Sequence, residues 1–188
     1  MASAFLDKIV GFGMADADRH PSKLEEEVVA LFGQLRVPVL RYLFSLRIPV
    51  PDAEEIAQEV FLALFQHLRQ GKSRANLQGW VFRVAHNLAL KQRIRIRRHS
   101  EHFSNLPSLS EIPGGITPGP EEEMEAMQLQ KSLLAVVRAL PEQDQCCLSL
   151  RAEGLRYREI AGVLGISLGS VANSLEKSLA RLTRAGGY

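Results

Sequence analysis

Basic side chains are concentrated in one stretch of this chain, in a pattern that suits an anionic ligand. Between Val60 and Ser100 there are nine Lys and Arg residues and no Asp or Glu. The densest part is KQRIRIRR, from Lys91 to Arg98. Closely spaced cations bind phosphates and release the counterions that surround them. The net charge of the whole chain is only +2, so the distribution of charge is more informative than its sum.

Acidic side chains gather just before the basic stretch. They are Asp52, Glu54, Glu55 and Glu59. A sharp separation of opposite charges predicts two different partners, one for each sign. A solvated helix face is the alternative interpretation of the acidic group.

No arrangement of residues predicts catalysis, a metal site or a cofactor. Gly71-Lys72-Ser73 resembles the end of a phosphate-binding loop, but Gln66 stands where that loop needs a glycine. The histidines, His20, His67, His86, His99 and His102, lack metal-ligand spacing. Cys146 and Cys147 are adjacent, which favours core packing in a reducing compartment. We therefore expect a protein that is not an enzyme.

The segment Leu155–Leu182 predicts a helix-turn-helix. Ile160 and Ala161 begin an apolar face, and Leu164 lies a turn later. Gly165 suits a turn with positive φ, and Ser167 is placed to cap the second helix. Apolar spacing then continues through Val171, Leu175, Ser178/Leu179 and Leu182. In DNA-binding proteins the second helix of this motif lies in the major groove, whereas in a helical bundle the same pattern is a hairpin.

The elements before this motif are also predicted to be helical. Apolar spacing predicts helices over about 25–47, with a kink or break at Pro38, and from Asp52 to about Gly71. Asp52 is expected to cap the second of these, with Glu55 completing a capping box. A third helix is predicted from about Trp80, with Ile94 as a possible end of its buried stripe.

The composition changes between His99 and Pro120, where four prolines and three glycines predict a flexible linker. One helix is expected to begin at Pro120. A second is expected to begin at Pro141 and to end at Gly154. The fold class is therefore all-α, with two small helical domains over 23–98 and 121–188, a linker over 99–120 and an extension over 1–22. Charged residues near the start argue against a signal peptide, and we expect a cytoplasmic protein without a membrane partner.

Two separate segments resemble one protein family. Asp52–Leu68 and Trp80–Leu90 with its basic tail are similar to region two of bacterial RNA polymerase sigma factors. Leu140–Leu182 resembles region four of the same family. Only a linker separates them, as in the extracytoplasmic-function group. The resemblance spans roughly residues 25–184 and implies a factor that brings core RNA polymerase to promoters.

For region two, the resemblance implies two binding surfaces. The acidic helix would dock on the clamp helices of the polymerase beta-prime subunit, through Asp52, Glu55, Gln58 and Glu59. The basic helix would hold the downstream promoter element as a single strand, through Arg83, Asn87, Lys91, Arg93, Arg95, Arg97 and Arg98. The loop of Lys72, Ser73, Arg74, Ala75 and Asn76 corresponds to the one that selects bases in this group. Trp80 and Phe82 are candidate platforms for stacked bases, but at helical spacing they are expected to be core residues.

For region four, the resemblance implies duplex binding at the upstream element and a contact with the polymerase beta flap. The family pattern after the turn carries cations where this chain has Ala172 and Ser174, which weakens the expectation. The candidate DNA-binding residues are Arg156, Arg158, Ser167, Ser170, Asn173, Lys177 and Arg181. Arg156 also replaces a capping serine opposite Glu159.

Two other functions remain open from the sequence. One is a regulator that binds duplex DNA by its helix-turn-helix without polymerase, against which the Asp52–Arg98 segment argues. The other is a sigma-like interaction protein with reduced DNA binding, which the depleted recognition helix keeps open. An anti-sigma factor is a further candidate partner that the sequence does not identify.

Overall fold

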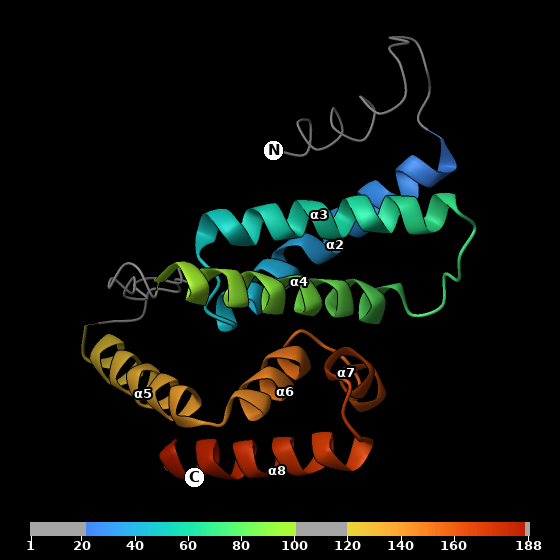
Figure 1. The fold of residues 1–188 in the computed structure, drawn as a ribbon. Coiled ribbons are helices and arrows are strands. Elements are labelled where there is room, and N and C mark those ends of the chain that lie inside the picture. Colours follow the sequence, from blue (N-terminus) through green and yellow to red (C-terminus); the bar gives the residue numbers. More distant parts are fainter. Residues whose placement is uncertain (1–21, 101–119, 187–188) are drawn as a thin grey trace. The chain divides into compact units, whose positions relative to one another are not determined.

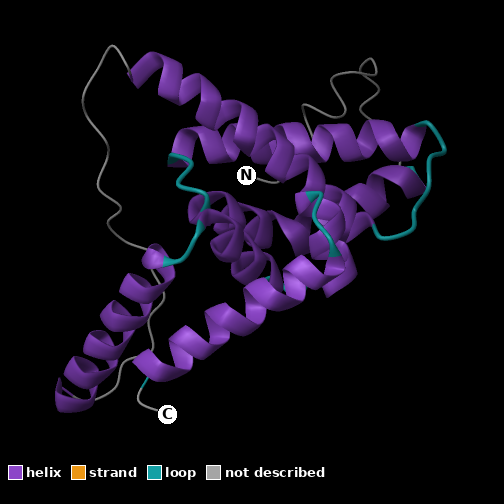
Figure 2. Ribbon diagram, turned by 60° about the horizontal axis from the view of Figure 1, so that its bottom comes forward, coloured by secondary structure: helices purple, strands orange, loops and turns teal. Residues whose placement is uncertain are grey.

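The computed structural model describes residues 22–100 and 120–186, and these residues form helices without any strand (Figures 1 and 2). The elements are α2 (Lys23–Ser45), α3 (Val50–Arg69), α4 (Leu77–Ser100), α5 (Pro120–Ala139), α6 (Glu142–Ala152), α7 (Tyr157–Leu164) and α8 (Leu168–Ala185). The predicted all-α class is confirmed. Most of the predicted linker and extension lie outside the described residues, while His99, Ser100 and Pro120 belong to helices rather than to the linker.

The first group of helices, α2 to α4, is held together by aromatic and aliphatic side chains. α2 packs along α3, where the Phe32 and Phe61 rings meet edge-on with centroids 4.9 Å apart. Tyr42 of α2 meets Phe82 of α4 in the same way at 5.7 Å. Tyr42, Phe61 and Phe82 are completely buried. The predicted core position of Phe82 is thereby confirmed.

α2 combines a capped start with a long apolar stretch. Ser22 and Glu25 form a capping box at its start, in which the Ser22 hydroxyl accepts from the Glu25 N–H at 3.3 Å. The helix continues through Pro38, and Val28, Val39 and Leu43 are fully buried. An 18-residue stretch of α2 has a mean hydropathy of 1.3, so by length and composition alone the helix is apolar enough to cross a membrane. Its buried residues pack instead against the helices of its own domain.

The start of α3 differs from the prediction. We expected Asp52 to be the capping residue, but the helix begins at Val50 with Pro49 at the N-cap and no side-chain cap. The expected capping box between Asp52 and Glu55 is therefore wrong. Proline suits the first helical turn because it presets φ and lacks an N–H that would need a partner. Pro51 thus lies inside the helix. Asp52 falls in the first turn, where its negative charge interacts favourably with the positive end of the helix dipole.

α4 starts earlier than predicted and buries a different set of residues at its end. It begins at Leu77 rather than near Trp80. Val81, Phe82, Ala85 and Ala89 are fully buried, but Ile94 is 52% exposed. The expectation that Ile94 completes the buried stripe was therefore wrong. Ile94 is exposed because it lies on the same side of α4 as Arg83 and Lys91, away from Phe82 and Ala85.

The second group of helices packs around α8, which contacts both α5 and α6 (Figure 1). Its core contains Leu150, Leu155 and Ile160, all fully buried. Cys146 and Cys147 are buried free cysteines, as predicted. Gly154, with φ +89°, follows the end of α6 and reverses the chain toward α7.

The predicted helix-turn-helix is present as α7 and α8. Gly165 ends α7 in the left-handed conformation, with φ 67° and ψ 29°. The Ser167 hydroxyl then accepts from the Ser170 N–H at 3.1 Å and caps α8. Of the alternative pair Ser178/Leu179, Ser178 is buried and Leu179 is 53% exposed. The small Ser178 fits at the interface because its hydroxyl bonds back to the Ser174 carbonyl at 2.7 Å.

Candidate nucleic-acid and partner interfaces

The outward face of α4 combines cations, an amide and two apolar side chains. Arg83, Asn87 and Lys91 follow one another at four-residue spacing, so they lie on one face, and all three are exposed. The later cations Arg95, Arg97 and Arg98 are exposed as well, and Arg93 is half-buried. Leu90 and Ile94, which are 39% and 52% exposed, lie along the same face. The face thus carries cations, the groups that bind phosphates, together with amide and apolar groups of the kind that contact bases.

The loop before α4, residues 72–76, is exposed throughout. Arg74 donates from Nε and Nη2 to the two carboxylate oxygens of Glu27, at 3.2 and 3.1 Å. Asn76 adopts a left-handed conformation, with φ 54°, and its Oδ1 accepts from the Gly79 N–H at 3.0 Å. Asn76 therefore helps to start α4, and its carboxamide oxygen is already engaged. The sequence did not indicate this role.

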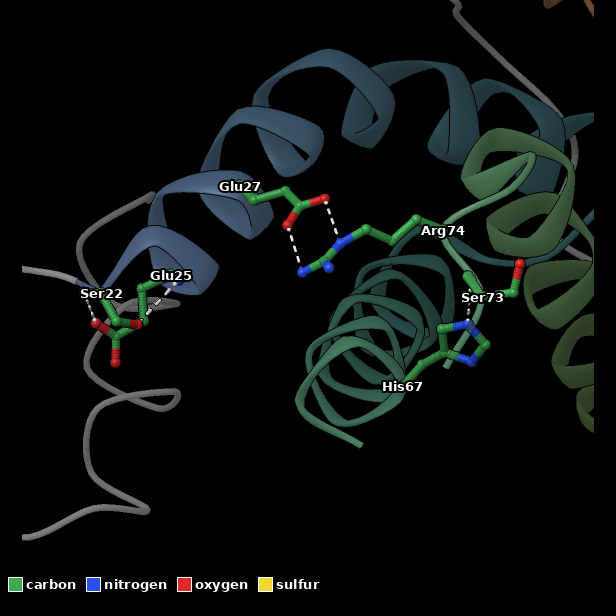
Figure 3. A network of polar contacts seen from close by, with 6 residues as sticks. All are labelled: Ser22, Glu25, Glu27, His67, Ser73 and Arg74. Carbon is green, nitrogen blue, oxygen red and sulfur yellow. Dashed lines mark hydrogen bonds and ion pairs between the residues drawn. The ribbon is translucent and has the colours of Figure 1, made fainter. Parts of the chain in front are cut away.

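Two residues outside the loop also contact it (Figure 3). The His67 Nε2 of α3 lies 2.9 Å from the Ser73 carbonyl oxygen. Its ring also lies against the Trp80 indole, with centroids 4.6 Å apart. Trp80 is half-buried rather than fully buried as a core residue would be. Neither His67 nor Glu27 was singled out from the sequence as part of a site.

The outward face of α3 carries the predicted acidic group. Glu55, Gln58 and Glu59 are exposed, and Asp52 is partly exposed. Leu62, which is 36% exposed, lies on the same side one turn beyond Glu59 and adds an apolar surface. Glu54 differs, because both its carboxylate oxygens accept from Arg36 of α2 at 2.8 Å. The structure thus separates Glu54, which ties two helices together, from the acids that are exposed on α3.

α8 presents a polar face beside its buried one. Asn173, Lys177 and Arg181 are exposed, and they recur with Ser170 at spacings of three and four residues along one side. The Ser167 and Ser170 hydroxyls lie 2.9 Å apart and bond to each other. Ser174 is buried, with only 4% of its surface exposed, and therefore cannot replace the missing cation on the outer face.

The start of α7 holds two further predicted DNA-binding residues, Arg156 and Arg158, and both are exposed. Arg156 is the N-cap of α7 and provides no side-chain acceptor, because a guanidinium only donates. The Glu159 carboxylate still accepts from the Arg156 N–H at 2.6 Å. Half of the usual capping arrangement is therefore retained without the serine.

The described residues offer little for metal binding or nucleophilic chemistry. Among them no group of three His, Cys, Asp or Glu residues is arranged to hold a metal ion. Burial raises the pKa of the Cys147 thiol, although a hydrogen bond with Ser174 opposes this shift. A buried thiol with a raised pKa is a poor nucleophile at neutral pH, because the thiolate is the reactive form.

Comparisons with known proteins place both helical groups in one family. Residues 31–101 match the family model for sigma-70 region 2, and residues 130–182 match the one for sigma-70 region 4. The chain is 29% identical over 137 residues to the ECF RNA polymerase sigma factor SigE of Mycolicibacterium smegmatis. That alignment covers 70% of this chain and 50% of SigE, so the chain spans about half the length of this relative.

Two solved structures share the fold. One is the sigma factor RpoE in complex with the anti-sigma factor NepR from Bartonella quintana, with a TM-score of 0.63 at 17% identity. It covers 83% of this chain and 96% of that one. The other is CnrH in complex with the cytosolic domain of CnrY, with a TM-score of 0.55 at 18% identity and coverage of 98% and 96%.

The two matched regions occur in family order, and their helices carry the surfaces described above. The matches and the helical architecture together show that this chain belongs to the sigma-70 family of RNA polymerase sigma factors and is similar to the extracytoplasmic-function group within it.

Proposed function

We propose that this protein directs core RNA polymerase to promoters. The observation that carries the proposal is the placement of opposite charges on successive helices of one domain. Glu55 and Glu59 are exposed on α3, whereas Arg83, Lys91 and Arg95 are exposed on α4. One factor is thereby equipped to hold a basic protein surface and an anionic nucleic acid at the same time.

The acidic face of α3 is proposed to bind the clamp helices of the polymerase beta-prime subunit. Glu55, Gln58 and Glu59 would supply the polar contacts, with Asp52 at the helix start. Leu62 lies beside Glu59 and provides the kind of apolar contact that interface centres need. Glu54 is not assigned to this interface because its carboxylate is paired with Arg36.

The face of α4 and the preceding loop are proposed to hold the downstream promoter element as a single strand. The cations from Arg83 to Arg98 would contact phosphates, and their contribution would depend on salt rather than on sequence. Asn87 lies among them with an exposed amide that is suited to base edges. Lys72, Ser73 and Arg74 remain exposed in the loop and would add selectivity.

The polar face of α8 is proposed to read the upstream element as a duplex, with Arg156 and Arg158 as phosphate contacts. Asn173, Lys177 and Arg181 are the exposed side chains that would approach the groove. Ala172 and the buried Ser174 add no cation, so this contact should contribute less than that of α4. A contact of this domain with the polymerase beta flap is also proposed from the family resemblance.

We propose that the protein acts in the bacterial cytoplasm, because that compartment contains the polymerase and the chromosomal DNA. Because the two solved structures that share this fold are named as complexes with CnrY and with NepR, we also propose that an anti-sigma factor regulates this chain. The proposed role requires no cofactor, and the chemistry of RNA synthesis would belong to the polymerase.

Run-off transcription tests the proposal. Core polymerase with the purified chain is expected to transcribe from a subset of templates in a library with randomised promoter elements, whereas core enzyme alone gives no promoter-dependent product. A regulator that acts without polymerase would bind duplex DNA but leave run-off transcription unchanged. A sigma-like interaction protein would bind polymerase and still produce no specific transcript.

Charge reversal on α3 tests the polymerase surface separately. Glu55→Lys combined with Glu59→Lys should abolish co-purification with core enzyme, because like charges would then face a basic partner surface. Glu26→Lys is a matched control, since Glu26 is an exposed acid on α2. Circular dichroism should show the same helicity for all three proteins. Undiminished co-purification of the double variant would show that α3 is not the polymerase-binding helix.

A further inference from the structure

The loop over residues 72–76 is exposed, yet almost every residue in it is held by a specific contact. An exposed loop with few apolar contacts is ordinarily among the most mobile parts of a fold. Here the chain enters through Gly71, with φ 67°, and leaves through Asn76, with φ 54°. The Lys72 N–H donates to the His67 carbonyl at 3.3 Å. The backbone is therefore constrained at both ends before any ligand arrives.

Glu27 of α2 holds the middle of the loop (Figure 3). Its two carboxylate oxygens accept from Nε and Nη2 of Arg74, which is the paired geometry that fixes the plane of a guanidinium. Arg74 nevertheless remains 59% exposed. A guanidinium has five N–H donors, and this contact engages one edge of the group. The other edge stays accessible to a base or a phosphate.

His67 of α3 holds the backbone on the other side of Arg74. A carbonyl oxygen only accepts, so Nε2 of His67 carries the proton that it donates to Ser73 at 2.9 Å. In Figure 3 the Ser73 side chain points away from the His67 ring. The ring of His67 is itself held against Trp80 at the start of α4. The loop is thus tied to α2, α3 and α4 at once.

The end of the loop is fixed by close packing. Asn76 Oδ1 accepts from the Gly79 N–H, and a Cβ added to Gly79 would lie 2.8 Å from that oxygen. A side chain at position 79 would therefore displace the Asn76 carboxamide from its present position against the first turn of α4. Residues 72, 73, 74 and 76 are therefore each anchored, and two of the anchors come from helices that carry no proposed DNA contact in this region.

We propose that Glu27 and His67 are positioning residues that order the 72–76 loop for base selection, Glu27 by aiming Arg74 and His67 by fixing Ser73. The inference rests on the proposed function, because it presumes that this loop reads the downstream promoter element. An ordered loop loses less conformational entropy on binding and presents its donors in one arrangement. Removing an anchor should therefore reduce selectivity more than overall affinity.

The test uses the full chain with core polymerase and a library of templates with randomised downstream elements. Glu27→Gln removes the charge with little change of size, and His67→Phe keeps a ring against Trp80 but cannot donate. Each variant should reduce the preference among bases at the loop-read positions by about twofold to fivefold, the range that an exposed ion pair or a single hydrogen bond supports. Total polymerase binding should not change. Glu26→Gln, an exposed neighbour on α2, is the matched control and should keep the natural preference.

A double-variant comparison shows whether Glu27 acts through Arg74. Arg74→Ala should relax the same promoter positions, and adding Glu27→Gln to it should cause no further change, because the two residues act as one unit. If Glu27→Gln raises affinity while base preference stays the same, Glu27 withholds Arg74 from DNA and the inference is overturned. Unchanged preference in both single variants would overturn it as well.

Hydrogen exchange of the free chain provides a readout that does not depend on promoter recognition. Glu27→Gln and His67→Phe should speed amide exchange in residues 72–76 and leave the amides of α3 unchanged. If the natural chain supports no promoter-dependent transcription, the proposed function fails, while exchange still decides whether these residues order the loop. Exchange in the loop that matches the natural chain would contradict the positioning role.

Discussion

Individual residues at helix starts decide where the helices of this protein begin. Ser22, Asn76 and Ser167 each accept a hydrogen bond from an N–H of the first helical turn. At α3 and α6 the N-cap residues are Pro49 and Pro141 instead, and neither helix start has a side-chain hydrogen bond. The first four N–H groups of a helix have no partner within it, so each such acceptor stabilises the local structure.

The cap at Ser167 leads to a prediction at this scale. Ser167→Ala should lower the free energy of unfolding by about 0.5–2 kcal/mol, because the Ser170 N–H loses its acceptor. Urea denaturation followed by circular dichroism measures the change. Ser132→Ala in α5 is the control: Ser132 is exposed within a helix, where alanine has the higher helix propensity. Equal stability of both variants would show that the Ser167 hydroxyl contributes nothing as a cap.

At the scale of the element, the same helix serves two purposes through its two faces. α4 buries Val81, Phe82 and Ala85 against its neighbours and exposes Arg83, Asn87 and other polar residues. The helical period of 3.6 residues is enough to place the apolar and the polar residues on different faces. A buried hydrogen bond of 2.8 Å between Tyr42 and His86 Nδ1 also fixes α4 against α2. The exposed face is therefore presented on a firmly held helix.

This division of α4 leads to a prediction about salt and sequence dependence. Replacing Arg95 and Arg97 by alanine should weaken binding to all single-stranded promoter fragments. It should also reduce the magnitude of the slope of log K against log[salt] by roughly 1.4, at about 0.7 for each phosphate contact. Asn87→Ala should instead change the ranking of promoters and leave this slope unaltered, since base contacts specify.

Fluorescence anisotropy over a range of salt concentrations measures both effects. Lys23→Ala combined with Lys131→Ala removes two exposed cations elsewhere and should leave the slope unchanged. If polymerase with the Asn87→Ala variant transcribes the same promoters with the same ranking of activity as with the natural chain, specificity does not depend on Asn87.

At the scale of the whole molecule, two helical groups are joined by a segment rich in proline and glycine. Each group has its own buried core, formed by residues such as Phe61 and Phe82 in the first and Leu150 and Ile160 in the second. The sequence of residues 101–119, which lie outside the described parts, predicts a linker that leaves the spacing of the two DNA sites to the polymerase. Linking two weak binding modules raises the effective concentration of the second.

Separating the two halves within residues 101–119 should therefore cripple promoter-dependent transcription even when both pieces are present. The second binding event would then no longer be intramolecular, so the gain from linkage would be lost. Run-off transcription on a template with both promoter elements measures the effect. As a control, a Gly-Ser insertion at the same site should retain most of the activity, because loop-closure entropy grows slowly with length. Full activity from the separated pieces, or from residues 1–100 alone, would show that the second group is dispensable.

The helical elements were predictable from the sequence because helix formation depends on patterns within a single segment. Apolar spacing and turn residues such as Gly165 and Ser167 predicted the all-α class and the helix-turn-helix. The capping box of Ser22 and Glu25 was equally visible as a Ser-x-x-Glu pattern and was missed. The charged faces of α3 and α4 could also be placed from the sequence, since exposure follows from helical spacing.

Only the tertiary structure decided which of several similar side chains is exposed and which is engaged. Leu179 belongs to the predicted apolar face of α8, yet it is 53% exposed, whereas its neighbour Ser178 is buried. Glu54 belongs to the acidic sequence cluster, yet it pairs with Arg36, which lies 18 residues away in the chain. Arg74 and Glu27 are 47 residues apart and meet only because α2 lies beside the loop. Contacts of this kind depend on how elements pack, and no pattern within one segment contains that information.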